Sequence, residues 1–203
     1  MNKIKICGLT NTNDISLCND LPIDFIGFNF YSKSKRFISI KTAETLIKNL
    51  SKDISKVGIF VNENVDTINH HISELDLDYV QLHGDETPEE IYKLKCKTIK
   101  AFSALDSNLP KKVIDFDTDY WLFDSANKEE RGGTGKTFDW SILSDISPKE
   151  KMILSGGINE SNILDAINKT RINIIDVCSG VELSPGYKDV KKLESIVRLV
   201  KDV

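Results

Sequence analysis

Cys7 and Asp124 are the two side chains best suited to acid–base chemistry, and each ends a short apolar run of the sequence. A thiol with an ordinary pKa of about 8.5 is a few per cent thiolate at neutral pH, and a nearby cation such as Lys5 increases that fraction. A thiolate and a carboxyl group on two sides of one bound molecule can remove a proton at one atom and deliver one at another. The alternatives are a small buried hydrophobic residue for Cys7, and a helix cap or loop ion pair for Asp124.

Two glycine-containing segments have the composition of a phosphate site. Gly156-Gly157 and Ser179-Gly180 each come just before a predicted helix start. Exposed backbone amides at such positions can converge on a phosphate, and the helix dipole favours the negative charge. Either segment alone also fits a tight turn, but two of them in adjacent loops favour phosphate binding.

Arg36, His83 and Asp176 are further polar candidates. The guanidinium of Arg36 can bind a carboxylate through two hydrogen bonds, although a solvated loop charge is the alternative. His83 can titrate or form a hydrogen bond at the site, and a structural histidine fits its position equally well. Asp176 lies near the end of the last apolar run and faces the same region.

A glycine-rich segment at 132–137 contains Gly-Lys-Thr but does not match the nucleotide-binding P-loop. That motif requires glycine five positions before Gly135, where the sequence has Glu130. We expect a flexible lid over the site instead. The four cysteines are widely spaced, with no Cys-x-x-Cys pair and no histidine at a zinc-ligand spacing, so the sequence predicts neither a metal site nor a disulfide framework.

Eight apolar, β-branched runs must position these residues. They begin near Lys3, Asp24, Lys56, Asp78, Thr98, Tyr120, Lys151 and Asn173, with helical patterns between them, among them 13–19, 87–90, 159–167 and 190–200. Spacing of this kind is typical of repeated βα units, which close into a barrel or form an open doubly wound sheet. In several runs every second residue is polar, and no Gly-x-Gly-x-x-Gly follows the first run. Both observations favour an α/β fold that is a single-domain (β/α)8 TIM barrel over residues 1–203. In such barrels the reacting groups lie at the carboxyl ends of the strands.

Composition excludes several other classes of protein. With 203 residues, 40% hydrophobic content and a net charge of −4, the chain fits one globular domain. The lysines are dispersed, which argues against nucleic acid as a partner. No apolar stretch approaches the roughly 18 residues of a membrane span, and the first residues lack a signal-peptide core, so we expect a cytoplasmic protein. We expect a monomer, because a closed barrel leaves no sheet edge to pair.

Seven blocks of sequence closely resemble the phosphoribosylanthranilate isomerase family. They are Lys5–Thr10, Gly27–Phe28 with Ser32–Ile38, Val57–Asn62, Val80–Gly84, Phe123–Ser125 with Gly132–Trp140, Leu154–Gly157, and Asp176–Glu182 with Pro185-Gly186 and Lys188-Asp189. The resemblance runs from the first strand to the last helix. It implies a barrel of the tryptophan pathway that converts N-(5-phosphoribosyl)anthranilate to 1-(2-carboxyphenylamino)-1-deoxyribulose 5-phosphate by an Amadori rearrangement, without a metal or an organic cofactor.

The resemblance also implies roles for individual residues. Cys7 is similar to the base that takes the proton from ribose C2, and Asp124 to the acid that protonates the furanose ring oxygen. Arg36 resembles the residue that binds the anthranilate moiety, while Gly156, Gly157, Ser179 and Gly180 resemble the phosphate site, and His83 and Asp176 contact or orient the substrate. The chain departs from the family at Cys178, where serine is common, and at Lys35, where proline is frequent.

Two other functions remain open at this point. A different sugar-phosphate isomerase or epimerase would use the same phosphate site, although the sequence offers neither metal-binding histidines nor a carboxylate pair for it. A non-catalytic barrel that binds a phosphorylated ligand is the other, and the presence of both Cys7 and Asp124 argues against it.

Overall fold

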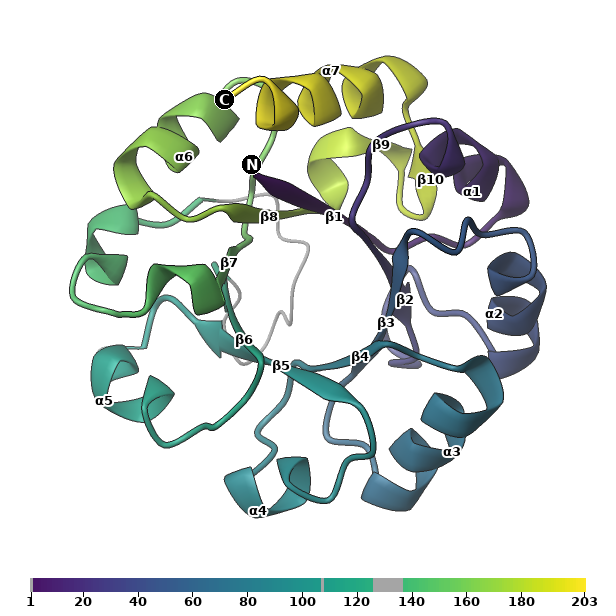
Figure 1. The fold of residues 1–203 in the computed structure, drawn as a ribbon, viewed down its shortest axis with the longest axis horizontal. Helices are drawn as coiled ribbons and strands as arrows, with labels where there is room; N and C mark the ends of the chain where they lie inside the picture. The colour runs from purple at the N-terminus through teal and green to yellow at the C-terminus, as the bar shows by residue number, and fades with distance from the viewer. Residues whose placement is uncertain (1, 107, 126–136) are drawn as a thin grey trace.

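A closed barrel of eight parallel strands forms the centre of the molecule (Figure 1). The computed structural model describes residues 2–106, 108–125 and 137–203. The strands, in barrel order, are β1 (Lys3–Cys7), β2 (Phe25–Asn29), β3 (Ser55–Phe60), β4 (Tyr79–Leu82), β5 (Lys97–Ser103), β6 (Tyr120–Asp124), β7 (Met152–Leu154) and β8 (Ile174–Val177). Each begins within one residue of its predicted start. The predicted (β/α)8 barrel is confirmed, and the open sheet is excluded because β8 pairs with β1.

Helices surround the barrel and begin where capping side chains allow. They are α1 (Thr12–Asn19), α2 (Ile40–Ile47), α3 (Val65–Leu75), α4 (Pro88–Ile91), α5 (Leu109–Val113), α6 (Ile163–Thr170) and α7 (Val190–Lys201). Thr87 and Glu90 form a capping box at α4, as the Thr-Pro-Glu-Glu pattern suggests. α1 begins at Thr12, slightly earlier than predicted, because the side chain of Asn11 accepts a hydrogen bond from the Asp14 amide.

The helices that follow β4 and β5 are short, the described residues after β6 contain no α-helix, and extra elements stand between β8 and α7. The described residues between β6 and β7 contain only two 3-10 turns, η1 (Trp140–Leu143) and η2 (Lys149–Lys151). Between β8 and α7 the chain adds η3 (Ser179–Val181) and a small antiparallel pair, β9 (Glu182–Ser184) and β10 (Tyr187–Lys188). The predicted lid at 132–137 lies outside the described residues except for Thr137.

The barrel interior is apolar near the amino ends of the strands and polar near their carboxyl ends. Alternate residues of the strands point inward, and those nearer the amino ends form a separate buried cluster of Phe25, Val57, Tyr79, Ile99, Ala101, Leu122, Ile153 and Ile174. A larger apolar cluster packs between the sheet and the helices. Continuing the inward parity towards the carboxyl ends gives Cys7, Gln81, Asp124 and Asp176. The strand pattern therefore aims these polar side chains at one end of the barrel.

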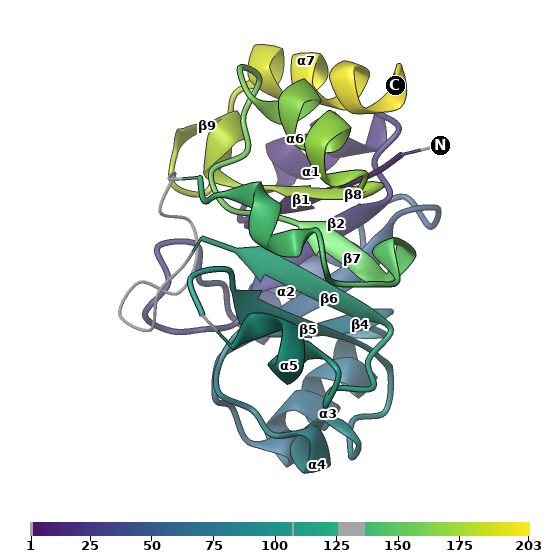
Figure 2. The same cartoon turned by 90° about the vertical axis from the view of Figure 1, so that its left-hand side faces the viewer.

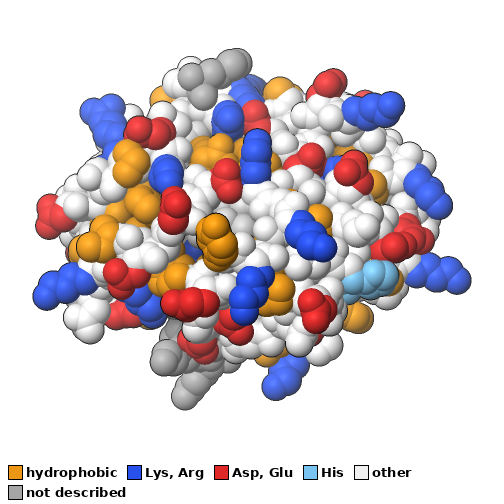
Figure 3. Space-filling view, turned by 60° about the horizontal axis from the view of Figure 1, so that its bottom comes forward, with side chains coloured by type: hydrophobic (Ala, Val, Ile, Leu, Met, Phe, Trp, Pro, Cys, Tyr) orange, Lys and Arg blue, Asp and Glu red, His pale blue; other side chains and the backbone are white. Residues whose placement is uncertain are grey.

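The two ends of the chain lie side by side at the amino end of the barrel (Figures 1 and 2). The Asn2 side-chain amide donates hydrogen bonds to the carbonyl oxygens of Val200 (3.3 Å) and Val203 (3.1 Å). On the face shown in Figure 3, acidic and basic side chains are interspersed rather than gathered by sign. Within the described part of the chain, the helices are too short or too polar to span a bilayer.

Candidate active site

A pocket at the carboxyl end of the barrel brings together nearly all of the predicted site residues. Its lining includes Cys7, Arg36, His83, Asp124, Gly156, Gly157, Asp176, Cys178 and Ser179. Gly180 is not part of the lining. It lies where the loops after β7 and β8 touch, since a Cβ added at Gly180 would be 2.1 Å from the carbonyl oxygen of Ile158. Gly180 thus permits the close approach of the two predicted phosphate loops.

Cys7 ends β1, where four neighbouring groups control the charge of its thiol. The Cys178 thiol donates a hydrogen bond to the sulfur of Cys7, and this bond is the largest influence on its pKa. Burial opposes ionisation, whereas the charges of Lys5 and Lys188 favour it. The net effect lowers the pKa of Cys7 to about 7, so the thiolate is abundant at neutral pH.

Lys5 favours the thiolate of Cys7 less than the sequence suggests, because its charge is paired. Its ammonium group is fully buried and forms an ion pair with Asp176 at 2.8 Å. The Asp176 charge partly offsets the effect of Lys5 on Cys7, because it raises the pKa of the thiol. The other carboxylate oxygen of Asp176 accepts a hydrogen bond from the Ser155 hydroxyl at 3.1 Å. Asp176 therefore links β8 to both β1 and the loop after β7.

Asp124 ends β6, where it is buried beside His83. The His83 Nε2 atom is 3.7 Å from an Asp124 carboxylate oxygen, and the Ser125 hydroxyl lies 3.4 Å from the other oxygen. Burial lowers the pKa of His83 against the attraction of Asp124, which keeps the ring neutral. The Gln81 amide nitrogen lies 3.0 Å from His83 Nδ1. If it donates there, the ring proton resides on Nε2 and faces Asp124.

Arg36 lies in the loop after β2 and is held on one side by a carboxylate of the protein itself. Its Nε and Nη2 atoms donate to Glu182 at 2.8 Å and 2.5 Å. Glu182 is buried and also accepts from Lys188 Nζ at 2.9 Å and from the Gly186 amide at 3.2 Å. Burial alone raises the pKa of Glu182, but Arg36 and Lys188 together lower it. Among the described residues Nη1 has no acceptor, which leaves that edge of the guanidinium for a ligand.

The two glycine loops present backbone suited to an anion. Gly156 and Gly157 both have left-handed conformations, with φ of 84° and 67°. A Cβ at Gly156 would also be 2.6 Å from the Ser125 amide nitrogen. Neither glycine amide donates to an acceptor within the described residues. Asn159 and Asn162 fix the loop by donating to the Gly157 carbonyl oxygen at 3.0 Å each.

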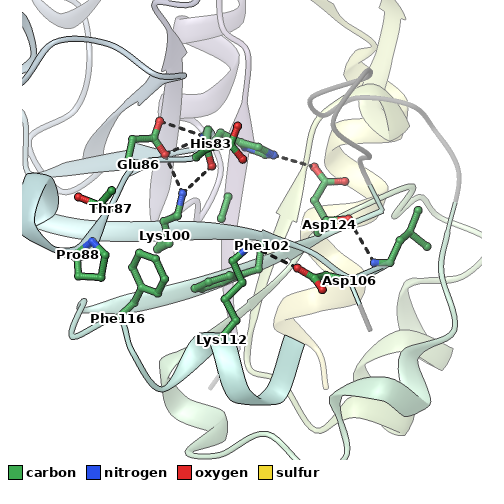
Figure 4. Close-up of a pocket in the computed structure, with 15 residues that line it drawn as sticks. His83, Glu86, Thr87, Pro88, Lys100, Phe102, Asp106, Lys112, Phe116 and Asp124 are labelled. Carbon is green, nitrogen blue, oxygen red and sulfur yellow. Dashed lines mark hydrogen bonds and ion pairs between the residues drawn. The ribbon is translucent and has the colours of Figure 1, made fainter. Parts of the chain in front are cut away.

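A larger cavity of about 600 Å³ adjoins this pocket and shares His83 and Asp124 with it (Figure 4). It lies over the loops after β4 and β5. Lys100 on its wall is buried and paired with Glu86 at 2.7 Å. Glu86 in turn accepts hydrogen bonds from backbone amides, so this pair fixes the loop after β4. Sequence reasoning did not identify this cavity.

Glu182, Lys188 and Cys178 are the polar groups at the site whose contacts sequence reasoning did not anticipate. Glu182 and Lys188 are the first and last residues of a Glu-x-x-x-Gly-x-Lys segment. Lys188 Nζ also donates to the Cys7 carbonyl oxygen at 2.6 Å. Both are charged residues flanking a left-handed glycine, Gly186. That pattern is a signal for a hairpin whose charged side chains turn inward. Among the described residues, no three His, Cys, Asp or Glu side chains are grouped as metal ligands.

The fold is that of a (β/α)8 barrel enzyme, with a thiol, a carboxyl group and two glycine-containing loops at the carboxyl ends of its strands. The model of the family N-(5'-phosphoribosyl)anthranilate (PRA) isomerase matches residues 4–199. The chain belongs to this family, and it is an isomerase of tryptophan biosynthesis.

Individual relatives support the assignment over the full length of the chain. The N-(5'-phosphoribosyl)anthranilate isomerase of Caldanaerobacter subterraneus subsp. tengcongensis is 44% identical, with 100% of both chains covered. A crystal structure of phosphoribosyl anthranilate isomerase with reduced 1-(o-carboxyphenylamino)-1-deoxyribulose 5-phosphate is 32% identical, with a TM-score of 0.85 and full coverage of both chains. A structure of mutually generated monomers of the dimeric Thermotoga maritima enzyme is also 32% identical, with a TM-score of 0.88 and full coverage of both chains.

Proposed function

We propose that Cys7 is the general base and Asp124 the general acid of the Amadori rearrangement of N-(5'-phosphoribosyl)anthranilate. The observation that carries this assignment is their placement at the ends of β1 and β6, in the lining of one pocket. β7 and β8 separate the two strands on the shorter way round the barrel. The two groups can therefore act on neighbouring atoms of one ligand from different sides.

The proposed roles imply two proton transfers. Asp124, as the acid, gives a proton to the furanose ring oxygen as the C1–O bond breaks, and the anthranilate nitrogen forms a C=N bond to C1. The Cys7 thiolate then removes the proton from C2, and its electron pair forms the enolamine, which tautomerises to the ketose. Burial lowers the pKa of His83, so the imidazole beside Asp124 carries no acidic proton to give in this step, and the carboxyl group is assigned as the acid.

The remaining residues bind the two anionic groups of the substrate. The Nη1 edge of Arg36 faces the anthranilate carboxylate, while Glu182 holds the opposite edge. The loops carrying Gly156-Gly157 and Ser179-Gly180 bind the phosphate through backbone amides. His83 and Asp176 orient the ribose between these two ends.

We further propose that residues 1–203 work as one catalytic barrel domain, as a monomer in the cytoplasm. Its partner is then the small-molecule substrate. All four cysteines are free thiols in the structure. A base that must stay reduced fits a reducing compartment.

Turnover by two variants tests the assignment. The loss of anthranilate-type fluorescence follows conversion of phosphoribosylanthranilate. We expect Cys7→Ser and Asp124→Asn each to lower kcat by at least about 100-fold, which is the smaller end of an acid–base contribution. Both variants should unfold near the wild-type temperature. Near-wild-type rates for both would refute the assigned roles, and no turnover by the wild-type chain would refute the activity itself.

A further inference from the structure

The base Cys7 has a second cysteine, Cys178, beside it on the neighbouring strand. β1 and β8 are paired in parallel, with Lys5 opposite Asp176 and Ile6 opposite Val177. Cys7 and Cys178 are the next residues along the two chains, directly after the paired residues Ile6 and Val177. Neighbouring strands lie about 4.8 Å apart, and disulfides join cysteines whose Cα atoms are about 4.4 to 6.8 Å apart. The backbone therefore already has a separation that a disulfide can bridge.

The two side chains also point into the same space. Both line the active-site pocket, and the thiol of Cys178 donates a hydrogen bond to the sulfur of Cys7. A Glu182 carboxylate oxygen, 4.0 Å from the Cys178 sulfur, is the alternative acceptor for the single proton of this thiol. The other two cysteines are elsewhere, since Cys18 is buried in α1 and Cys96 directly precedes β5. Cys7 and Cys178 are thus the one pair of sulfurs arranged to react with each other.

We propose that Cys7 and Cys178 form a reversible disulfide when the protein meets a hydroperoxide, and that this modification blocks the active site. The structure supplies the pair of thiols, and the hydroperoxide is the oxidant. Loss of turnover on modification rests on the proposed role of Cys7 as the base, whereas formation of the crosslink does not.

The reaction balances in two steps. The Cys7 thiolate attacks one oxygen of the peroxide, an S–O bond forms, the O–O bond breaks, and the departing hydroxide takes up a proton to give water. The Cys178 sulfur then attacks the sulfenic sulfur of Cys7, the S–S bond forms, the S–O bond breaks, and the second hydroxide leaves as water with the proton of Cys178. Two thiols lose two electrons in total, and one peroxide becomes two waters.

The electrostatics of the site favour this order of events. The lowered pKa of Cys7 makes it the nucleophile, and its position on the pocket wall gives a small peroxide access. In the reduced protein the Cys7 hydrogen bond, burial and the Cys7 charge raise the pKa of Cys178. A sulfenic acid at Cys7 removes that negative charge, while Lys188 and Arg36, which lower the pKa of Cys178, remain. Cys178 then becomes the resolving thiol.

The crosslink should be easy to reduce. Side chains of paired residues on neighbouring parallel strands project in the same direction, so a disulfide between them departs from relaxed geometry. Strained and accessible disulfides have the more oxidising potentials and are the labile ones. A dithiol should therefore restore both thiols and the active site.

Titration of the full-length protein with hydrogen peroxide tests the proposal. The readouts are non-reducing peptide mass mapping, a count of free thiols, and turnover before and after dithiothreitol. The variant Cys178→Ser keeps a hydrogen-bond donor beside Cys7 but cannot form the bond. Cys96→Ser is the matched control with all active-site thiols present. The activity of each protein is referred to its own untreated sample.

We expect the wild-type protein and Cys96→Ser to give a peptide joined through Cys7 and Cys178. In the wild type two of the four thiols should be lost, turnover should fall by about 100-fold, as for loss of a base, and dithiothreitol should restore both. Cys178→Ser should give no joined peptide and should instead accumulate Cys7 sulfinic acid, which dithiothreitol does not reverse.

Three results would overturn the proposal. They are oxidation of Cys7 in the wild type without the joined peptide, reaction of Cys18 or Cys96 while Cys7 stays reduced, and equal loss and recovery of activity in Cys178→Ser. Mass mapping needs no turnover. It therefore decides the crosslink even for a chain that fails to convert phosphoribosylanthranilate, a result that would count only against the proposed function.

Discussion

Cys7, as the proposed base, can remove a proton only as a thiolate, so the groups around its sulfur decide how much of the protein is competent at a given pH. The hydrogen bond from Cys178 contributes most to the lowered pKa, and Lys5 and Lys188 add their charges. The sequence suggested Lys5 alone, because it lies two residues away on the same strand face. Cys178 is 171 positions further along the chain, and only closure of the barrel brings it to Cys7. A contact of this kind has no local signal in the sequence.

The pH dependence of kcat/KM tests the proposed role of Cys7 as the base. Its pKa of about 7 lies below that of an ordinary thiol, and the active form is the deprotonated one, so kcat/KM should rise through about pH 7 and level off above it. Cys178→Ala removes the donor and moves this midpoint towards the ordinary thiol value of about 8.5. At pH 7 the thiolate fraction, and with it kcat/KM, then falls by up to about 15-fold. Cys178→Ser, which retains a donor, should move the midpoint less.

Cys96→Ser is the control for this measurement, since Cys96 lies outside the pocket, and its profile should match that of the wild type. Superimposable profiles for wild type and Cys178→Ala would contradict the role given to the hydrogen bond. The same result would leave the disulfide proposal standing, because that proposal depends on the placement of both cysteines in one pocket at the ends of the paired strands β1 and β8.

At the scale of elements, the sequence predicts regular repeats well and their exceptions poorly. Short apolar, β-branched runs marked all eight strands, because each strand is buried between the barrel interior and the surrounding helices. The β9–β10 hairpin was not predicted, since its strands have three and two residues and carry no apolar alternation. The hairpin serves mainly to make contacts with distant parts of the chain. Glu182 reaches across 146 positions to fix Arg36, and Lys188 fixes the carbonyl group of Cys7.

The proposed phosphate site needs the loops after β7 and β8 to lie close together, and they meet at Gly180. A methyl group there would meet the Ile158 carbonyl oxygen, so Gly180→Ala must push the loops apart. We expect inorganic phosphate to inhibit this variant at least about 10-fold more weakly, which corresponds to about 1.4 kcal/mol of lost binding. Overpacking should also lower the free energy of unfolding by about 1 to 3 kcal/mol.

Inhibition by phosphate and thermal unfolding measure these two effects separately. Ser184→Ala is the matched control, because Ser184 lies on the same loop and is exposed. It should leave both quantities unchanged. Equal phosphate inhibition in Gly180→Ala and wild type would show that the two loops do not need this contact to bind the anion.

For the whole molecule, barrel closure determines both where the site lies and what the surface offers to a second copy. The eight main strands pair in a ring, so none has a free edge for another chain. Cys7, Asp124 and Arg36 all line one pocket at the mouth of this ring. A single chain thus contains the proposed acid, base and carboxylate-binding group.

We therefore expect one chain to be the active unit, although the Thermotoga maritima relative is described as dimeric. Sedimentation velocity at assay concentrations should give a single species near 22.9 kDa. Specific activity should stay constant on dilution, since no residue of the proposed machinery has to come from a partner. A species of twice that mass whose dissociation lowers kcat would show that the loops at the barrel mouth need a second chain to hold their shape, and the one-chain proposal would then be wrong.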